Sequence, residues 1–231
     1  MTGRWPARLT ACTAILALTV AVDPAVGQQQ VRKPRAAASA AAETKAAPAK
    51  VDYGPRFAQL CAACHGANGR SDMPGTPVLA GQPSLYVITQ LFLFREGRRD
   101  NQAMTAVAKT LTDDDLRGFS DYIGTLPPVP APPLESPSDP ARMAKGKALA
   151  EQHKCLFCHG TDFSGGQQVP RIAGQREDYL QVSLRGFHSG KRAAYTQAMP
   201  AAVSQISVED LDTLAYFAAR FTAASAAPAA R

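Results

Sequence analysis

Apolar residues recur at helical spacing along the chain, and no segment alternates convincingly between apolar and polar residues as a strand would. Residues 84–96 form the clearest helical segment, and Gly97 provides a natural end for it. The side that we expect to be buried carries four apolar residues, namely Leu85, Ile88, Leu91 and Phe92. Residues 177–188 repeat the pattern and end near Gly190. The sequence therefore predicts an all-α fold.

Two further helices are indicated by capping signals. Thr112 followed by Asp115 is typical of a helix start, and Ser207 followed by Asp210 repeats that spacing. An apolar stripe follows each signal, made of Leu116, Phe119 and Ile123 in one case and of Leu211, Leu214 and Ala218 in the other. The same kind of helix is thus expected twice.

The two halves of the chain repeat each other. Cys61 corresponds to Cys155, 94 residues later, and residues 77–82 correspond to residues 170–175 at an offset of 93. Five more pairs keep the offset of 93, in which Tyr86, Leu91, Phe94, Gly97 and Arg99 correspond to Tyr179, Leu184, Phe187, Gly190 and Arg192. So little drift over several matched features indicates an internal duplication.

The duplication and the prolines divide the chain into domains. We expect a first domain at residues 51–126, a stiff and extended Pro-rich linker at 127–140, and a second domain at 141–222. Each domain has about 80 residues, which is small for a self-sufficient hydrophobic core. A buried cofactor would supply much of the missing apolar contact.

The N-terminal segment is typical of an export signal. A positively charged start is followed by the apolar run 9–22 and by small residues that predict cleavage after Gly27, so that 1–27 is a signal peptide. The run is short for a membrane span, and an uncleaved anchor is the weaker alternative. Residues 28–50 are expected to be a disordered Ala/Pro-rich tether, and 223–231 a flexible tail. The chain is therefore expected in the periplasm.

Charge gives only a weak indication of partners. The chain has a formal net charge of +6, and removal of the signal peptide leaves +5. The tether contains three basic residues, Arg32, Lys33 and Arg35. They would allow weak association with an anionic membrane surface or an acidic partner, or would simply be solvated. Two basic clusters could face a cofactor carboxylate, a partner or solvent: Arg95, Arg98 and Arg99, and Arg185, Lys191 and Arg192. Nucleic-acid binding is not expected, because no aromatic–basic motif is present.

Two copies of C-x-x-C-H carry the chemistry of the chain. The first consists of Cys61, Cys64 and His65, and the second of Cys155, Cys158 and His159. In this motif both thiols attach haem covalently and the histidine is the proximal ligand of the iron. The sequence therefore predicts two covalently bound haem c groups, each with an iron.

The cysteine count leaves little room for other sites. Of the five cysteines, four lie in the two motifs and the fifth, Cys12, lies in the signal peptide. A zinc ion held by the four thiolates is the alternative, but it would leave His65 and His159 without a reason to follow each cysteine pair.

Two methionines are candidates for the sixth position of each iron. Met104 and Met199 follow His65 and His159 by 39 and 40 residues, at equivalent places in the repeat. Each is expected on a loop before the last helix of its domain, from which a thioether would approach the iron. The remaining candidates are expected to be structural or exposed, and they are Met73, Met143, His153 and His188.

With both motifs, the two Pro-x-x-Ala-Gly-Gln strings and the two late methionines, residues 51–222 resemble the dihaem cytochrome c4 family, a pair of class I cytochrome c domains. A proximal histidine needs an acceptor for its second ring nitrogen. The resemblance implies that the carbonyls of Pro77 and Pro170 are these acceptors. It also implies that the two haems pack edge to edge across a domain interface.

Two closed His–Met irons would make the chain an electron carrier and not an enzyme. The resemblance implies that it takes electrons from a quinol-oxidising complex or a dehydrogenase and delivers them to a terminal oxidase of a respiratory chain. A cytochrome subunit of a periplasmic dehydrogenase is the alternative. A dihaem peroxidase or thiosulfate dehydrogenase is a further alternative. Such an enzyme would need an iron with an open sixth position or an unusual sixth ligand, and no cysteine is left to provide one.

Overall fold

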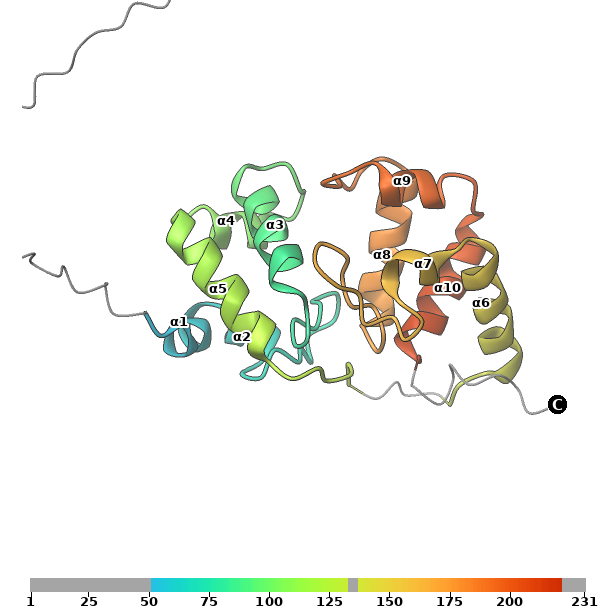
Figure 1. Cartoon of the computed structure of the whole chain (residues 1–231), viewed down its shortest axis with the longest axis horizontal. Coiled ribbons are helices and arrows are strands. Elements are labelled where there is room, and N and C mark those ends of the chain that lie inside the picture. The colour runs from blue at the N-terminus through green and yellow to red at the C-terminus, as the bar shows by residue number, and fades with distance from the viewer. Residues whose placement is uncertain (1–50, 133–136, 222–231) are drawn as a thin grey trace, which may run out of the picture. The chain divides into compact units, whose positions relative to one another are not determined.

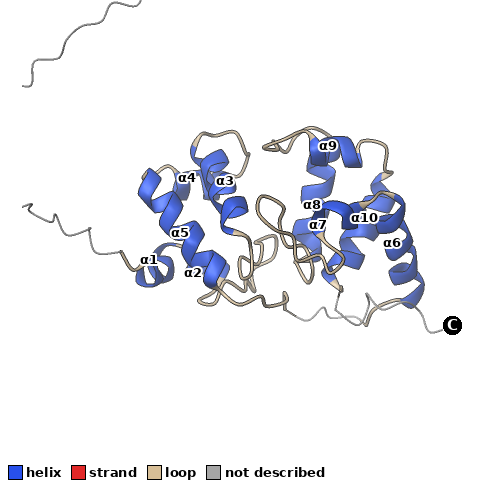
Figure 2. Ribbon diagram, in the orientation of Figure 1, coloured by secondary structure: helices blue, strands red, loops and turns tan. Residues whose placement is uncertain are grey.

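Helices make up the regular secondary structure of the described chain. The computed structural model describes residues 51–132 and 137–221 (Figure 1). These residues contain ten helices and no strand beyond an isolated bridge between Gly166 and Val169 (Figure 2). No helix in these ranges is long and apolar enough to cross a membrane. The predicted all-α fold is confirmed.

Three predicted segments lie outside the residues that the structure describes. They are the signal peptide at 1–27, the tether at 28–50 and the tail at 223–231. The expectations for them therefore stay predictions.

The ten helices fall into two sets of five that follow the internal repeat. The first set is α1 Tyr53–Leu60, α2 Ala62–His65, α3 Ser84–Arg95, α4 Gln102–Ala108 and α5 Asp113–Thr125. The second set is α6 Pro140–Gln152, α7 Cys155–His159, α8 Glu177–His188, α9 Ala198–Val203 and α10 Val208–Ala219. Helix α3 packs against α5 in the first half, and α10 packs against α6 and α8 in the second.

The predicted capping residues begin α5 and α10. The Thr112 hydroxyl accepts a hydrogen bond from the Asp115 N–H at 3.2 Å, and the Asp115 carboxylate accepts one from the Thr112 N–H at 3.0 Å. The Ser207 hydroxyl accepts from the Asp210 N–H at 3.1 Å. Glycines in the left-handed conformation follow α3 and α8, and they are Gly97 and Gly190. The predicted ends of these helices agree with the structure to within one or two residues.

The cores confirm the stripes of the last helices but correct the predicted face of α3. Leu116, Phe119 and Ile123 are buried in the first half, and Leu211, Leu214 and Ala218 in the second. In α3, however, Leu85 is 51% exposed and Phe92 is 38% exposed, whereas Val87, Leu93 and Phe94 are buried. Because α3 is apolar almost all round, its sequence does not distinguish one face from another.

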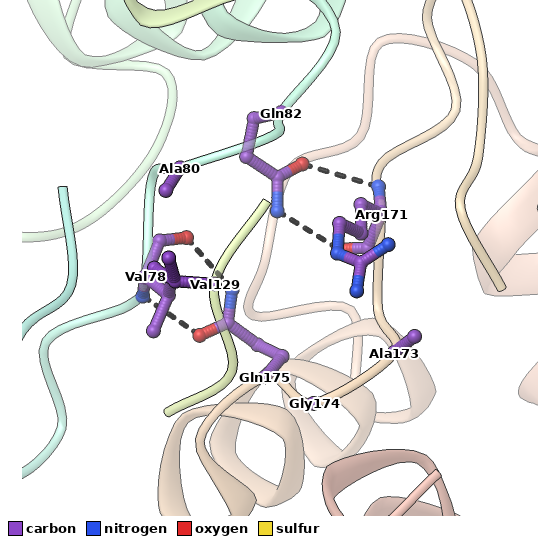
Figure 3. Close-up of a pocket in the computed structure, with 8 residues that line it drawn as sticks. All are labelled: Val78, Ala80, Gln82, Val129, Arg171, Ala173, Gly174 and Gln175. Atoms are coloured by element: carbon purple, nitrogen blue, oxygen red, sulfur yellow. Dashed lines mark hydrogen bonds between the residues drawn. The ribbon is translucent and has the colours of Figure 1, made fainter. Parts of the chain in front are cut away.

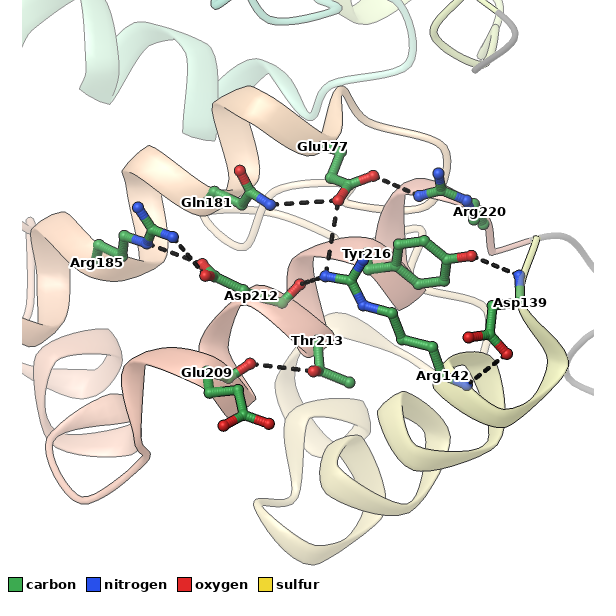
Figure 4. A network of polar contacts seen from close by, with 10 residues as sticks. All are labelled: Asp139, Arg142, Glu177, Gln181, Arg185, Glu209, Asp212, Thr213, Tyr216 and Arg220. Carbon is green, nitrogen blue, oxygen red and sulfur yellow. Dashed lines mark hydrogen bonds and ion pairs between the residues drawn. The ribbon is translucent and has the colours of Figure 1, made fainter. Parts of the chain in front are cut away.

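A polar network joins α6, α8 and α10 of the second half (Figure 4). The guanidinium of Arg220 pairs with Glu177, and these side chains are only 10% and 18% exposed. The guanidiniums of Arg142 and Arg220 lie over the ring of Tyr216, at 4.0 and 3.6 Å from its centroid. The Tyr216 hydroxyl accepts a hydrogen bond from the Asp139 N–H at 2.6 Å. These contacts attach the start of α6 to α8 and to the end of α10.

The described part of the linker lies along the two Ala-Gly-Gln strings. The Ala131 N–H donates to the Gly174 carbonyl at 2.7 Å. Gly81 has a φ of 74°, and a Cβ placed on it would lie 2.7 Å from a carbon of the Pro128 side chain. Both the backbone conformation and the proline therefore require glycine at this position.

Candidate haem sites

Each C-x-x-C-H motif lies on a single helical turn. Cys64 and His65 belong to α2, which Cys61 immediately precedes, and the second motif forms α7. One turn brings the residues at positions i, i+3 and i+4 to the same side of the helix. The thiols of all four motif cysteines are free, with the second cysteine of each pair exposed and the first half-buried. The two thiols and the imidazole of each motif can therefore meet one flat group.

The two motif histidines are buried and held in a defined orientation. His65 and His159 are each 6% exposed. The Nδ1 atom of His65 lies 2.9 Å from the Pro77 carbonyl oxygen, and that of His159 lies 3.0 Å from the Pro170 oxygen. A carbonyl only accepts hydrogen bonds, so Nδ1 carries the proton and the Nε2 lone pair is left for a metal. Burial lowers the pKa of both imidazoles, and the bond to the carbonyl offsets part of this effect.

The four motif cysteines do not form one group of metal ligands in the described residues. Within residues 51–132 and 137–221, no three His, Cys, Asp or Glu side chains form a cluster that could hold a metal. This arrangement does not favour the four-thiolate zinc site that the sequence left open as an alternative.

The two candidate axial methionines lie on helices and not on the loops that were expected. Met104 is in α4 and Met199 is in α9, and both are half-buried. Each of these helices is only two turns or less, which explains why the sequence gives no clear periodic signal for them. Asn101 caps the start of α4, and its side chain accepts a hydrogen bond from the Met104 N–H at 2.9 Å. Met199 packs against the core of the second half.

The remaining methionines and histidines have other surroundings. Met73 is 46% exposed, and Met143 packs against the core of the second half. His153 and His188 were expected to be exposed, but both are half-buried. His188 lies in the last turn of α8, where its Nδ1 is 2.9 Å from the Val203 carbonyl oxygen. This contact with α9 turns the ring away from solvent.

The two basic clusters of the sequence contain exposed arginines and lysine as well as half-buried arginines. Arg95 pairs with Asp113 and Glu96, and Arg185 pairs with Asp212. Arg98 and Lys191 are exposed. Arg99 and Arg192, which correspond in the repeat, turn inward instead. The members of each predicted cluster therefore have different surroundings and do not form one basic surface.

Arg99 and Arg192 form a half-buried cluster with two tyrosines that also correspond in the repeat. Arg99 donates to the Tyr179 hydroxyl at 3.0 Å, and Arg192 donates to the hydroxyls of Tyr179 and Tyr86 at 3.3 and 3.4 Å. Burial raises the pKa of Tyr86 to about 12. Burial acts in the same direction on Tyr179, but the charges of Arg192 and Arg99 outweigh it and lower the pKa of that phenol.

This cluster and the motifs together fit a haem. In the part of the chain that the structure describes, neither Arg99 nor Arg192 pairs with a carboxylate. The buried Nε atoms of Arg192 and Arg70 have no hydrogen-bond partner. Buried cations need anionic partners, and the propionates of haem are carboxylates. Free thiols, a free Nε2 and guanidiniums without a carboxylate partner fit the attachment, the ligation and the propionates of haem c.

Two glutamines that the sequence analysis did not single out connect the halves (Figure 3). Gln82 and Gln175 are only 5% and 4% exposed. The Gln82 amide bonds the backbone N–H and C=O of Arg171, and the Gln175 amide bonds those of Val78. The sequence signal was a glutamine at the same place in both copies of the repeat, directly after Ala-Gly. The sequence therefore marks both residues as part of the repeat without indicating their role.

Comparisons with known proteins agree with this arrangement. The Cytochrome c family matches residues 51–127 and 143–218. The chain is 35% identical over 144 residues to a cytochrome c4 of Thiocapsa roseopersicina, covering 58% of this chain and 72% of that one. It is 32% identical over 178 residues to the thiosulfate dehydrogenase electron acceptor of Thiomonas intermedia, covering 71% and 78%.

A solved structure extends the likeness to the fold. The cytochrome c4 of Acidithiobacillus ferrooxidans superimposes with a TM-score of 0.61 at 30% identity, covering 71% of this chain and 99% of that one. The duplication, the two helical-turn motifs and these relatives all lead to one assignment. The chain is an electron-transfer cytochrome with two covalently bound haem c groups in tandem class I domains, and it belongs to the dihaem cytochrome c4 family.

Proposed function

We propose that this protein is a periplasmic carrier of two electrons and not an enzyme. His65 and Met104 ligate the iron of the first haem, and His159 and Met199 ligate that of the second. The cysteines of each motif form the thioether bonds, and the domains span residues 51–126 and 141–222. The observation that supports this proposal best is the pair of buried imidazoles whose Nδ1 atoms bond the Pro77 and Pro170 carbonyls.

The residues around each haem would act mainly by fixing its position and the orientation of its ligands. When bound, haem supplies an iron that takes up and releases one electron. Each proline carbonyl keeps the proton on Nδ1 and orients the ring, so that Nε2 faces the iron in both oxidation states. A thioether from Met104 or Met199 as the second protein ligand would leave no position for a substrate, which would suit electron transfer.

The cluster of two arginines and two tyrosines would hold the carboxylates of the cofactor. Arg99, Arg192, Tyr86 and Tyr179 together present donors from both halves of the chain. Propionates placed there would neutralise the two guanidiniums in a low-dielectric setting, where charge-assisted hydrogen bonds are strong. The cluster would therefore bring the carboxylate edges of the two haems to the contact between the halves.

The partners are redox proteins. We propose that electrons come from a quinol-oxidising complex or a periplasmic dehydrogenase and leave to a terminal oxidase. The likeness to a protein named as a thiosulfate dehydrogenase electron acceptor supports a second candidate, in which this chain receives electrons from such a dehydrogenase. Haem chemistry is the same in both cases, and a dehydrogenase that co-purifies with the chain would favour the second.

Near-infrared absorption of the oxidised haem-loaded protein tests the ligand assignment. Ferric His–Met haem has a weak charge-transfer band from methionine to iron, and we expect an intensity that corresponds to two haems. Met104→Ala and Met199→Ala should each remove half of it, whereas Met73→Ala should remove none. An intensity of one haem in the unaltered protein would show that one iron is open or differently ligated, and would contradict the carrier proposal.

A further inference from the structure

The peptide unit that holds each motif histidine also contacts the opposite half of the chain. In the first half, the Pro77 carbonyl oxygen lies 2.9 Å from His65 Nδ1. The N–H of the same peptide unit belongs to Val78, and it donates to Gln175 Oε1 at 2.8 Å (Figure 3). One peptide unit therefore joins the imidazole of the first half to the glutamine of the second.

The second half repeats this arrangement in reverse. The Pro170 carbonyl oxygen lies 3.0 Å from His159 Nδ1, and the Arg171 N–H of the same peptide unit donates to Gln82 Oε1 at 3.1 Å. The glutamine belongs in this case to the first half. Each half thus supplies a buried amide to the peptide unit behind the histidine of the other.

The orientation of both glutamine amides follows from their partners. A backbone N–H only donates, so the oxygen of each amide must face it. The Nε2 atoms donate in turn to the Val78 carbonyl at 2.9 Å and to the Arg171 carbonyl at 2.8 Å. Each amide is therefore fixed at both ends against the backbone of the other half.

Hydrogen bonds at the two ends of one peptide unit strengthen each other. Acceptance of the N–H by a glutamine oxygen polarises the peptide and makes its carbonyl a better acceptor, by roughly 10–30% per bond. A better acceptor draws the Nδ1 proton of histidine more strongly and raises the basicity of the ring as a ligand. A more basic imidazole stabilises ferric over ferrous iron.

We propose that Gln175 is a positioning residue for the first haem and Gln82 one for the second. Each glutamine acts through the peptide unit behind the opposite histidine and lowers the reduction potential of the opposite haem. The potentials then depend on the contact between the halves, so that separation of the halves would raise both. This proposal rests on the ligand assignment made above, because it needs His65 and His159 on the irons.

Gln175→Met and Gln82→Met in the full haem-loaded chain test the proposal. Methionine keeps the volume of glutamine and removes the amide. Both midpoint potentials are measured by spectroelectrochemistry, and the Nδ1–H signals of the two histidines by NMR of the reduced protein. The haems are assigned by the signals that disappear in Met104→Ala and Met199→Ala.

We expect each variant to change the haem of the other half. Gln175→Met should favour the ferrous form of the first haem by about three- to tenfold, which is a rise of at most about 59 mV for one electron. It should also move the His65 Nδ1–H signal, with a smaller effect on the second haem. Gln82→Met should give the mirror result. Gln181→Met is the matched control, since Gln181 bonds Glu177 within the second half, and both potentials should stay unchanged.

Other patterns would overturn the proposal. Equal shifts of both haems would indicate a general loosening of the contact, and a shift confined to the haem of the same half would indicate a local effect. No shift would show that the amide has no influence. If Gln175→Met does not load haem, Gln175→Leu replaces it, which also removes the amide, and an unchanged first potential would contradict the proposal. A missing near-infrared band in the unaltered protein would instead refute the ligand assignment.

Discussion

Asp115→Asn should lower the stability of the first half in a way that depends on pH. The Asp115 side chain is 8% exposed, and its carboxylate accepts hydrogen bonds from Arg56, from the Tyr53 hydroxyl and from the Thr112 N–H. The bond from Arg56 is the largest cause of a pKa that lies well below the ordinary value of 3.8. This carboxylate therefore joins α1 to the start of α5 in its ionised form.

The expected loss can be derived from these contacts. A hydrogen bond to a charged group contributes about 1.5–3 kcal/mol. Asparagine keeps a neutral acceptor for Tyr53 and Thr112, and water screens the pair with Arg56, whose side chain is 41% exposed. We therefore expect Asp115→Asn to reduce the free energy of unfolding by about 2 kcal/mol at pH 7.

The pH dependence of this loss follows from the lowered pKa. Because the pKa is lower in the folded state, the ionised carboxylate stabilises the fold above the unfolded value of 3.8, and this contribution disappears as the pH falls further. The difference between Asp115→Asn and the unaltered protein should thus be full at pH 7 and shrink below about pH 4.

Denaturant unfolding of the haem-loaded protein, followed by circular dichroism at pH 7, 5 and 3, measures this difference. Asp114→Asn is the control, since Asp114 pairs with Arg117 at side-chain exposures of 87% and 62%, and its stability should hardly change. A loss for Asp115→Asn that is the same at pH 3 as at pH 7, or no larger than that of Asp114→Asn, would refute the reasoning.

Two further predictions concern other contacts of the fold. Gly81→Ala should destabilise the protein by about 1–3 kcal/mol in thermal unfolding, because the added Cβ meets Pro128 and φ is 74°. Gly75→Ala has a similar φ of 72° but open space around its Cβ, so a loss as large as that of Gly81→Ala would show that the clash has no effect. Glu177→Gln should cost about 3 kcal/mol, since it leaves the buried Arg220 guanidinium without its charged partner; an unchanged melting temperature would contradict this.

The sequence predicted those parts of the fold that depend on local patterns. The capping pairs at Thr112 and Ser207 act through neighbours three residues away, so both helix starts follow directly from the sequence. The duplication likewise predicted that the helices occur in two equivalent sets. The buried side of α3 was predicted wrongly, because a helix that is apolar almost all round is oriented by its tertiary contacts.

The candidate site was predicted less completely than the fold. The motifs and the resemblance indicated His65 and His159 together with the proline carbonyls that the structure places beside them. The inward turn of Arg99 and Arg192 was not predictable, because the sequence does not show which basic residue finds an acidic neighbour. The contacts of Gln82 and Gln175 join residues 89 and 97 positions apart, which no local pattern reveals.

The reciprocal contact of the two glutamines has the form of an isologous dimer interface. Gln82 bonds Arg171 while Gln175 bonds Val78, and both pairs come from corresponding positions of the repeat. In an isolated single unit water would solvate this amide, and self-association would bury it again, as in the subunits of a twofold-symmetric homodimer. The covalent linker makes that association intramolecular, at an effective concentration in the millimolar range. Fusion of the two units thereby makes their pairing independent of how much protein the cell contains.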